Sequence, residues 1–308
     1  MYQIQKNNNS QALVKYILLL LIFLVLPLQA QTLKIASWNI AWLGSHKFNK
    51  RSANDYHELA IYAKQLNADV IALQEVENGE YARKVFGDDY DYYFSTNNWV
   101  QRVGVAVRKS KGYQVTASEY KALDVGRVRY GMDITLAKGN EKFRLLAVHL
   151  KSGCFDKPLD NSSVSAMVNA SKSAKKKRNA CEKLAKQIQP LEAWIDQRAA
   201  ENVPFVVIGD FNRRFNKDID NSYSEDAGMW QAIDDDGAEA MWTPTTSKNS
   251  KCWGGYYQDF IDHIVFDPKA KQRYVKDSFN QLVFEGKYTK QLSRSLSDHC
   301  PISVELTL

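Results

Sequence analysis

Several short apolar segments of this chain end on a polar side chain that can bind a metal ion or a phosphate. Four of these segments end on the following residues: Asn39, Glu75, His149, and Asp210 with Asn212. Asp298 and His299 stand just before a fifth segment, residues 301–308. Short apolar segments rich in β-branched residues are typical of buried strands. A polar side chain where such a strand leaves the core is how a rigid sheet builds a catalytic site, so we expect these residues to meet in one pocket.

Asn39, Glu75 and Asp298 are the predicted metal ligands. Two carboxylates and one amide are oxygen ligands that a hard divalent cation such as Mg²⁺ takes, with Mn²⁺ and Ca²⁺ as alternatives. Three protein ligands leave room for water and for a substrate phosphate, and a cation bound in this way polarises a phosphoryl oxygen. Asn39 or Glu75 taken alone also fits a helix cap or a turn, so the prediction depends on the ligands meeting.

Gly209-Asp210-Phe211-Asn212 is the first of two motifs that carry catalytic side chains. Asp210 and Asn212 are two positions apart, so both side chains can face the same side of an extended backbone. A carboxylate can orient or deprotonate an attacking water, and an amide can hold a phosphate oxygen. The alternative interpretation is an Asx-turn, in which both side chains are satisfied locally.

Ser297-Asp298-His299 is the second motif, and it offers a side chain for proton transfer. Histidine titrates near neutral pH, so His299 suits acid–base chemistry. A carboxylate on a neighbouring strand would fix the tautomer of that ring and raise its basicity, and Asp262 is the best candidate for this partner. His149 supplies a second imidazole, which makes a structural role for His299 alone a weaker interpretation.

The first 30 residues predict a signal peptide. Residues 16–28 are almost wholly apolar, Lys15 precedes them, and Ala30 is a small residue where a signal peptidase can cut. This apolar segment is short for a membrane-spanning helix, and an uncleaved anchor is the alternative. We therefore expect export to the periplasm or to the outside of the cell, with residues 31–308 forming one catalytic domain.

The four cysteines predict disulfides, because an even number of cysteines in an exported chain is usually oxidised. Three pairings are possible. We favour Cys154 with Cys181, which leaves Cys252 with Cys300. A zinc site is the alternative, but the chain has no Cys-x-x-Cys spacing.

Strands outnumber helices in the expected secondary structure, which predicts an α/β protein with more than one sheet and mixed strand directions. Strands are expected near residues 33–40, 70–75, 90–95, 103–108, 113–121, 130–137, 143–150, 205–209, 260–266 and 302–307, and helices near residues 53–66 and 180–200. The 308 residues permit a sizeable core, and the net charge of +6 suits a polyanionic substrate without requiring one.

Residues 152–180 are rich in serine, asparagine and lysine, and they predict a long mobile loop beside His149. The basic run at residues 172–178 has two interpretations. It is either a basic flap that attracts a phosphate backbone or a solvated run at the start of the helix near residues 180–200.

The order of these motifs resembles the endonuclease/exonuclease/phosphatase superfamily, which includes pancreatic-type deoxyribonucleases, apurinic-site endonucleases, sphingomyelinases and inositol-phosphate phosphatases. The following segments carry the resemblance: Trp38-Asn39, Gln74-Glu75, His149, Gly209-Asp210-Phe211-Asn212, Ile261-Asp262-His263-Ile264 and Ser297-Asp298-His299. It runs from about Leu33 to Leu308. It implies a four-layer sandwich of two packed mixed β-sheets flanked by helices, with the site at one rim, and metal-dependent cleavage of a phosphoester.

The resemblance also implies roles for the catalytic side chains. His299 should act as the general base or as a charged stabiliser, oriented by Asp262. Asp210 and Asn212 should position the nucleophile and the scissile phosphate, and His149 should contact the phosphate.

For the metal, the resemblance implies Glu75 as a ligand, with Asn39 and Asp298 close to it. Apurinic-site endonucleases carry an aspartate two residues after the strand asparagine, and this chain has Ala41 there. That difference weakens the prediction of a DNA-repair enzyme and of a second ligand from the same strand.

The function predicted from the sequence is an exported, metal-dependent phosphodiesterase, with a nuclease acting on DNA or RNA favoured. The alternative is an enzyme for phospholipids or small phosphate esters, since Trp42 and Trp253 are expected beside the pocket mouth, where they could touch a membrane. A non-enzymatic binding module would lack at least one catalytic residue, and none is missing. The segment from Lys151 to Cys154, together with Cys181, resembles a bacterial exported subgroup. No stable protein partner is predicted.

Overall fold

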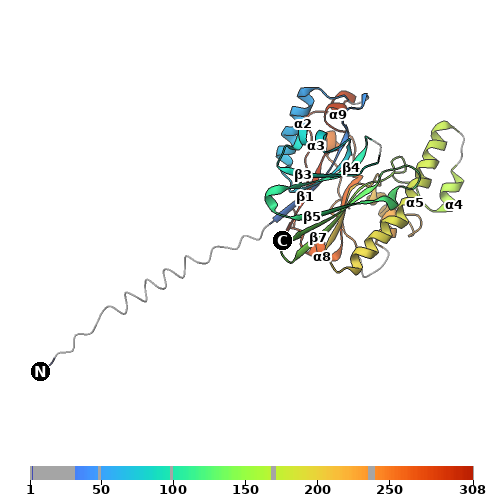
Figure 1. The fold of residues 1–308 in the computed structure, drawn as a ribbon. Coiled ribbons are helices and arrows are strands. Elements are labelled where there is room, and N and C mark those ends of the chain that lie inside the picture. Colours follow the sequence, from blue (N-terminus) through green and yellow to red (C-terminus); the bar gives the residue numbers. More distant parts are fainter. Residues whose placement is uncertain are drawn as a thin grey trace.

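Two β-sheets pack face to face in the computed structural model of the protein, and helices cover their outer faces (Figure 1). The structure describes Tyr2 and residues 32–47, 50–97, 100–167, 171–234 and 240–307. Apart from Tyr2, the predicted signal peptide therefore lies outside the described residues. Among the helices of the described ranges, none combines the length and the apolar character that crossing a membrane requires.

The first sheet has six strands and mixed directions. In spatial order its strands are β10 (Asn280–Gln281), β11 (Ile302–Thr307), β1 (Thr32–Leu43), β2 (Val70–Val76), β4 (Arg102–Arg108) and β3 (Tyr90–Phe94). β1 runs parallel to β2 and antiparallel to β11. The carboxyl ends of β1 and β2 therefore meet at one rim of the sheet.

The second sheet has five strands and is also mixed. Its strands are, in spatial order, β5 (Gln114–Tyr120), β6 (Gly131–Lys138), β7 (Glu141–His149), β8 (Phe205–Asp210) and β9 (Asp262–Phe266). β7 and β8 are parallel, and the other neighbours are antiparallel. The ends of β7 and β8 and the start of β9 consequently lie side by side.

The central strands are largely apolar because both of their faces are buried. On β1, Ile35 packs into the core between the two sheets, whereas the next residue, Ala36, packs against the helices outside. On β8, Ile208 faces the other sheet, and Val207 faces the helical layer. This alternation accounts for continuous apolar segments in strands that would otherwise show a polar face.

The outer layers complete the sandwich. α2 (Ala53–Leu66) and α3 (Gly79–Phe86) cover the six-stranded sheet, and α5 (Lys172–Ala200) covers the five-stranded sheet (Figure 1). The shorter helices are α4 (Asn161–Ala166), α6 (Phe215–Asp220), α7 (Met229–Ile233), α8 (Pro268–Gln272) and α9 (Lys290–Ser295), with 3₁₀ turns η2 (Lys109–Lys111), η3 (Lys121–Leu123) and η4 (Cys252–Gly255). The expected four-layer α/β sandwich is confirmed.

The prediction of one long loop over residues 152–180 was wrong. α4 lies within this segment, and α5 begins at Lys172, so that the basic run forms its first turns. The Ser171 Oγ accepts a hydrogen bond from the Ala174 backbone N at 3.1 Å and caps the helix. Lysine and alanine are also good helix formers. The loop was predicted from the polar composition of the segment, which does not take this helix propensity into account.

Both disulfides favoured from the sequence are present. Cys154 joins Cys181 and thereby ties the segment after β7 to α5. Cys252 joins Cys300 and ties the η4 turn to the residue that follows His299. None of the described cysteines is free.

Candidate active site

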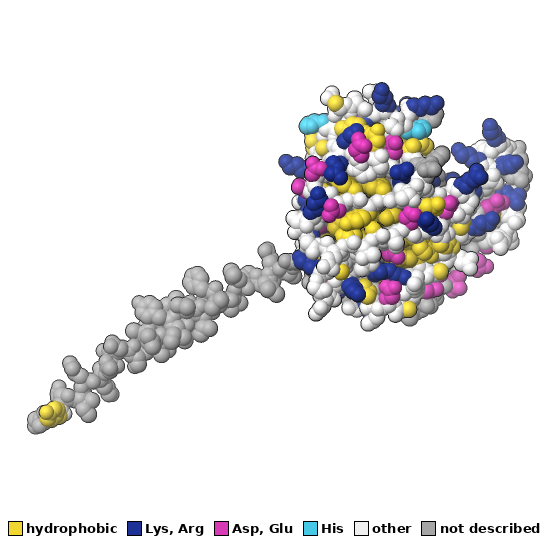
Figure 2. Space-filling view, viewed as in Figure 1, with side chains coloured by type: hydrophobic (Ala, Val, Ile, Leu, Met, Phe, Trp, Pro, Cys, Tyr) yellow, Lys and Arg dark blue, Asp and Glu magenta, His cyan; other side chains and the backbone are white. Residues whose placement is uncertain are grey.

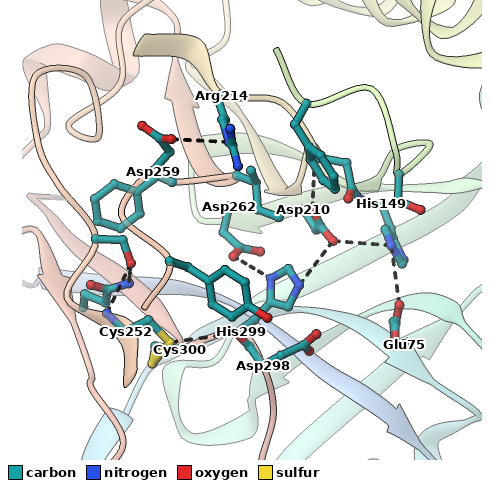
Figure 3. Close-up of a pocket in the computed structure, with 18 of the residues that line it drawn as sticks. Glu75, His149, Asp210, Arg214, Cys252, Asp259, Asp262, Asp298, His299 and Cys300 are labelled. Atoms are coloured by element: carbon teal, nitrogen blue, oxygen red, sulfur yellow. Dashed lines mark hydrogen bonds and ion pairs between the residues drawn. A yellow bond between two sulfur atoms is a disulfide. The ribbon is translucent and has the colours of Figure 1, made fainter. Parts of the chain in front are cut away.

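A pocket of about 570 Å³ opens at the rim where the strand ends of both sheets converge (Figure 3). Seven of the eight residues predicted from the sequence line it: Glu75, His149, Asp210, Asn212, Asp262, Asp298 and His299. The eighth, Asn39, reaches the same cluster through a hydrogen bond to Asp210. Tertiary structure therefore brings together residues that are up to 260 positions apart in the chain.

The strand register places three of these side chains in a row. His149 pairs with Asp210 across β7 and β8, and Asp210 pairs with Asp262 across β8 and β9. Directly paired residues project from the same face of a sheet, at short Cβ separation. The five-stranded sheet thus supplies an imidazole and two carboxylates from a rigid surface.

Local backbone conformations direct the remaining side chains. Gly209 has φ +147°, and an added Cβ would lie 2.1 Å from the Val148 carbonyl oxygen, so only glycine fits there. Glu75 has φ +59° and lies where the register between β2 and β4 shifts between Gln74 and Val76. A β-bulge of this kind redirects a side chain out of the strand alternation, and the Glu75 carboxylate lies in the pocket as a result.

The Asp210 carboxylate is the centre of the polar network. Its Oδ2 accepts a hydrogen bond from the Asn39 Nδ2 at 3.0 Å, and its Oδ1 accepts one from the Asn212 backbone N at 2.8 Å. The Nε2 atoms of His149 and His299 lie 3.4 Å and 3.9 Å from the same Oδ2. Burial raises the pKa of Asp210 to about 6, against the opposing effect of the His299 charge. Asp210 is therefore a carboxylate that can exchange a proton near neutral pH.

His299 is held by Asp262, as the sequence predicts. Its Nδ1 lies 2.7 Å from the Asp262 Oδ2, and its backbone N donates to the Ser297 Oγ at 3.0 Å. Burial by itself lowers the pKa of His299, but the charges of Asp262 and Asp210 outweigh that effect and raise the pKa well above its usual value. His299 is consequently an imidazolium at neutral pH, with Nε2 turned toward Asp210.

We expect Asp262→Asn to lower the pKa of His299, because the amide removes the largest favourable charge beside the ring. The measurement is the pH titration of the His299 ring protons by NMR. Asp259→Asn is the matched control, since Asp259 lines the same pocket and pairs with Arg214 at 3.4 Å. An unchanged His299 titration in Asp262→Asn would contradict the assigned contact.

Glu75 and Asp298 form a second carboxylate pair, on the same side of the pocket (Figure 3). The Glu75 Oε1 accepts a hydrogen bond from the Gln101 Nε2 at 2.6 Å. Burial, followed by the charge of Asp298, raises the pKa of Glu75 to about 7. Glu75 is half-buried and Asp298 is exposed at the pocket mouth. Two carboxylates that face one pocket suit a divalent cation, which would offset the repulsion that Asp298 exerts on Glu75.

His149 differs from His299 in its charge state. Burial, then the charges of Arg129 and His299, lower the pKa of His149 well below its usual value, so its ring is neutral. The His149 Nε2 lies 3.8 Å from the Glu75 Oε1 and 3.4 Å from the Asp210 Oδ2. The ring thus stands between the two carboxylate groups of the pocket.

Sequence reasoning missed several polar pocket residues, among them Arg214, Asp259 and Gln101. The Arg214 Nη1 lies 3.1 Å from the Asp156 Oδ2, and this arginine comes two positions after Asn212. A cation so close to the predicted motif was a usable signal. Gln101 offered none, since it reaches Glu75 only through the pairing of β2 with β4.

The expectation that Trp253 borders the mouth, exposed to a membrane, was wrong. Its side chain is buried at 2% exposure, and its Nε1 donates to the Ser297 carbonyl oxygen at 3.0 Å. The ring therefore supports the segment that carries His299. The lipid hypothesis loses one of its two aromatic residues.

Solved structures with the same fold cover nearly all of this chain. A humanised TDP2 of D. rerio with 14 mutations has a TM-score of 0.58 at 17% identity, over 90% of this chain and 99% of that chain. An endonuclease/exonuclease/phosphatase from Bacteroides vulgatus has a TM-score of 0.56 at 15% identity, over 90% and 99%. The human Nocturnin catalytic domain, with a bound sulfate anion, has a TM-score of 0.53 at 13% identity, over 89% and 93%.

The identities to these structures are low, and the likeness therefore concerns the fold. No curated protein sequence matches the chain. The sequence profile of the Endonuclease/Exonuclease/phosphatase family, however, matches residues 36–299, a range that contains all eight predicted site residues. The chain therefore belongs to the endonuclease/exonuclease/phosphatase family, a family of phosphoester hydrolases.

Proposed function

We propose that the protein is an exported, metal-dependent phosphodiesterase that hydrolyses DNA or RNA. The single observation that carries this proposal is the Asp210 carboxylate, which lies between the neutral His149 ring and the charged His299 ring. A base beside a fixed cation is what water attack on a phosphodiester requires.

The proposed roles follow from the protonation states. Asp210 accepts the proton of the attacking water, because its pKa of about 6 leaves it ionised at neutral pH yet still basic. His299 already holds a proton and stabilises the negative charge that develops on the phosphate oxygens. Asn212 and His149 hold the phosphate in line with the water.

Glu75, Asp298 and Asn39 are the proposed ligands of a divalent cation. The Asn39 Oδ1 accepts a hydrogen bond from the Ala41 backbone N at 3.0 Å, which fixes its amide beside Asp210. A bound Mg²⁺ or Mn²⁺ would supply Lewis acidity toward a phosphoryl oxygen. The protein's own contribution is to hold the two carboxylates and the amide in place.

A basic surface supports nucleic acid as the substrate. The first turns of α5 carry Lys172, Lys175, Lys176, Lys177 and Arg178, and Figure 2 shows lysine and arginine side chains gathered on the protruding part of the molecule formed by α4 and α5. The pKa of Lys151, next to the pocket, is lowered by burial and by nearby cations that include Lys176. One TDP2 structure with this fold is complexed with a single-strand DNA product.

Export is supported by the two disulfides, which persist in oxidising compartments. We propose residues 1–30 as a signal peptide and residues 31–308 as the mature catalytic domain. The compartment is then the periplasm or the cell exterior.

A substrate panel tests the proposed function. Purified protein is incubated with single-stranded DNA, duplex DNA, RNA, sphingomyelin vesicles and inositol phosphates, with Mg²⁺ or with excess EDTA. We expect cleavage of nucleic acid with Mg²⁺ and none with EDTA. Turnover of sphingomyelin or inositol phosphate alone would replace the nuclease with the lipid or small-ester alternative, and cleavage in excess EDTA would exclude the metal.

A further inference from the structure

A loop at residues 252–258, here called the tyrosine loop, forms one edge of the catalytic pocket. Tyr256 and Tyr257 line the pocket, and their side chains are 62% and 39% exposed. Among the large exposed apolar side chains of the described ranges, they are the two that border this pocket. Two exposed aromatic rings beside the catalytic groups offer a surface for a flat partner.

The rings are held by contacts with a third tyrosine. Tyr256 stacks on Tyr288 with ring centroids 4.2 Å apart and an interplanar angle of 9°. Tyr257 meets Tyr256 edge-on, at 4.8 Å and 90°, and also meets Tyr288, at 5.6 Å and 82°. The stack restrains Tyr256 in spite of its exposure, which lowers the conformational entropy that a ligand would lose on binding.

The tyrosine loop is fastened to the segment that carries His299. Cys252 forms a disulfide with Cys300, which directly follows His299. The Trp253 Nε1 donates to the Ser297 carbonyl oxygen at 3.0 Å. The position of the tyrosines is therefore fixed relative to the catalytic histidine, by one covalent bond and one buried hydrogen bond.

The backbone of the tyrosine loop is strained. Trp253, Gly254 and Gly255 have φ values of +53°, +67° and +82° in succession. Glycine adopts this conformation freely, but a bulky residue such as tryptophan does so at a cost. Such strain persists only where the surroundings enforce it, and here the disulfide of Cys252 and the buried indole of Trp253 enforce it.

We propose that Tyr256 and Tyr257 form a stacking platform for a nucleobase next to the scissile phosphate, fixed to His299 through the Cys252–Cys300 disulfide. This inference rests on the proposed nuclease function and names the part of the substrate that this edge of the pocket binds. Every base has a π-face, so such a platform binds single strands with little sequence preference.

A nucleobase suits the platform better than a lipid does. The buried position of Trp253 removes the residue best able to insert into a bilayer. Tyr256 and Tyr257 lie beside a pocket whose lining includes the cations His299 and Arg214, which suit an anionic phosphate backbone that continues from a flat ring. Base–aromatic stacking changes affinity by about 5-fold to about 160-fold per base.

The test compares two single-stranded oligomers of equal length and identical phosphodiester backbone. One carries adenine at every position, and the other carries a base-free tetrahydrofuran at every position. We expect the wild-type kcat/KM to be at least about 10-fold higher for the adenine oligomer. We expect Tyr256→Ala to lower this ratio toward one by slowing cleavage of the adenine oligomer, with Tyr256→Phe retaining the wild-type ratio.

A binding measurement separates stacking from catalysis. A 2-aminopurine oligomer is titrated into Asp210→Asn, which holds the substrate without cutting it, and into the double variant Asp210→Asn/Tyr256→Ala. We expect quenching of the 2-aminopurine fluorescence in the first variant and a loss of most of it in the second. Equal quenching in the two variants would contradict the stacking platform but not the nuclease function. An equal fall in the cleavage rates of the adenine and tetrahydrofuran oligomers in Tyr256→Ala would have the same meaning. Cleavage of neither oligomer by the wild-type protein would overturn the proposed nuclease as well.

Discussion

Asp210→Asn lowers kcat on a nucleic-acid substrate by roughly 10³-fold or more, because the amide cannot accept the proton of the attacking water. The Asp210 Oδ2 lies 3.4 Å from the His149 Nε2 and 3.9 Å from the His299 Nε2, so the substitution also removes a charge that both rings face. The side-chain size is unchanged, and the Asn212 backbone N keeps an oxygen to which it can donate. The measurement is steady-state cleavage of a labelled oligomer with Mg²⁺.

The pH profile gives this prediction a second readout. The wild-type rate rises as the pH increases through about 6, where Asp210 loses its proton, and the residual rate of Asp210→Asn lacks that rise. Asp220→Asn is the matched control, since Asp220 is exposed and its Oδ2 lies 3.4 Å from the Lys217 Nζ, in an ion pair of α6. A wild-type rate in Asp210→Asn, with an unchanged thermal midpoint, would show that this carboxylate is not the base.

Glu75→Gln has the second large effect, and it acts on both activity and stability. The substitution removes one carboxylate from the proposed cation site, and we expect kcat/KM with Mg²⁺ to fall on the order of 10³-fold, equivalent to about 4 kcal/mol. The neutral amide can still bond to Gln101, so the fold is retained. The measurement is cleavage over a series of Mg²⁺ concentrations, with a lower metal affinity of the variant as the second result.

In the metal-free protein, we expect Glu75→Gln to raise the free energy of unfolding, whereas it lowers the activity of the metal-bound enzyme. Folding raises the pKa of Glu75 from 4.5 to about 7, so between these values the folded state binds more protons than the unfolded state. The free energy of unfolding therefore falls as the pH rises from about 4.5 to about 7, by up to about 3 kcal/mol for this one group. The free energy of unfolding of Glu75→Gln does not fall in this way, because the amide has no proton to lose in this pH range.

In EDTA at pH 8 we therefore expect the thermal midpoint of Glu75→Gln to lie above that of the wild type, by roughly 5 °C. At pH 5 the two midpoints should be closer together. Glu80→Gln is the control, because Glu80 is exposed on α3 and the same substitution there changes no buried group. A variant less stable than the wild type at pH 8 would show that the ionised Glu75 does not destabilise the metal-free protein. That result would remove one argument for the cation site.

The sequence by itself determined most of the strands and the type of chemistry. Its apolar segments predicted β1, β2, β7 and β8 to within three residues at each end, because a strand buried on both faces is made largely of apolar residues. Helix α2 was predicted with its observed bounds, since apolar or small residues recur within it at helical spacing, as Leu59, Ala63 and Leu66 do. Local patterns of this kind are set by neighbours along the chain.

Only the tertiary structure decided how the polar residues meet and which protons they hold. The pKa of His149 is lowered and that of His299 is raised, although both are histidines of one pocket. These shifts depend on burial and on charges from distant segments, and no sequence spacing encodes them. The Glu75–Gln101 contact and the stack of Tyr256 on Tyr288 likewise arise from strand pairing and loop packing. Electrostatic and packing energies depend on distance in space, whereas the sequence orders residues only along the chain. The sequence therefore predicted which polar residues gather in the pocket, but not the protonation state of each one.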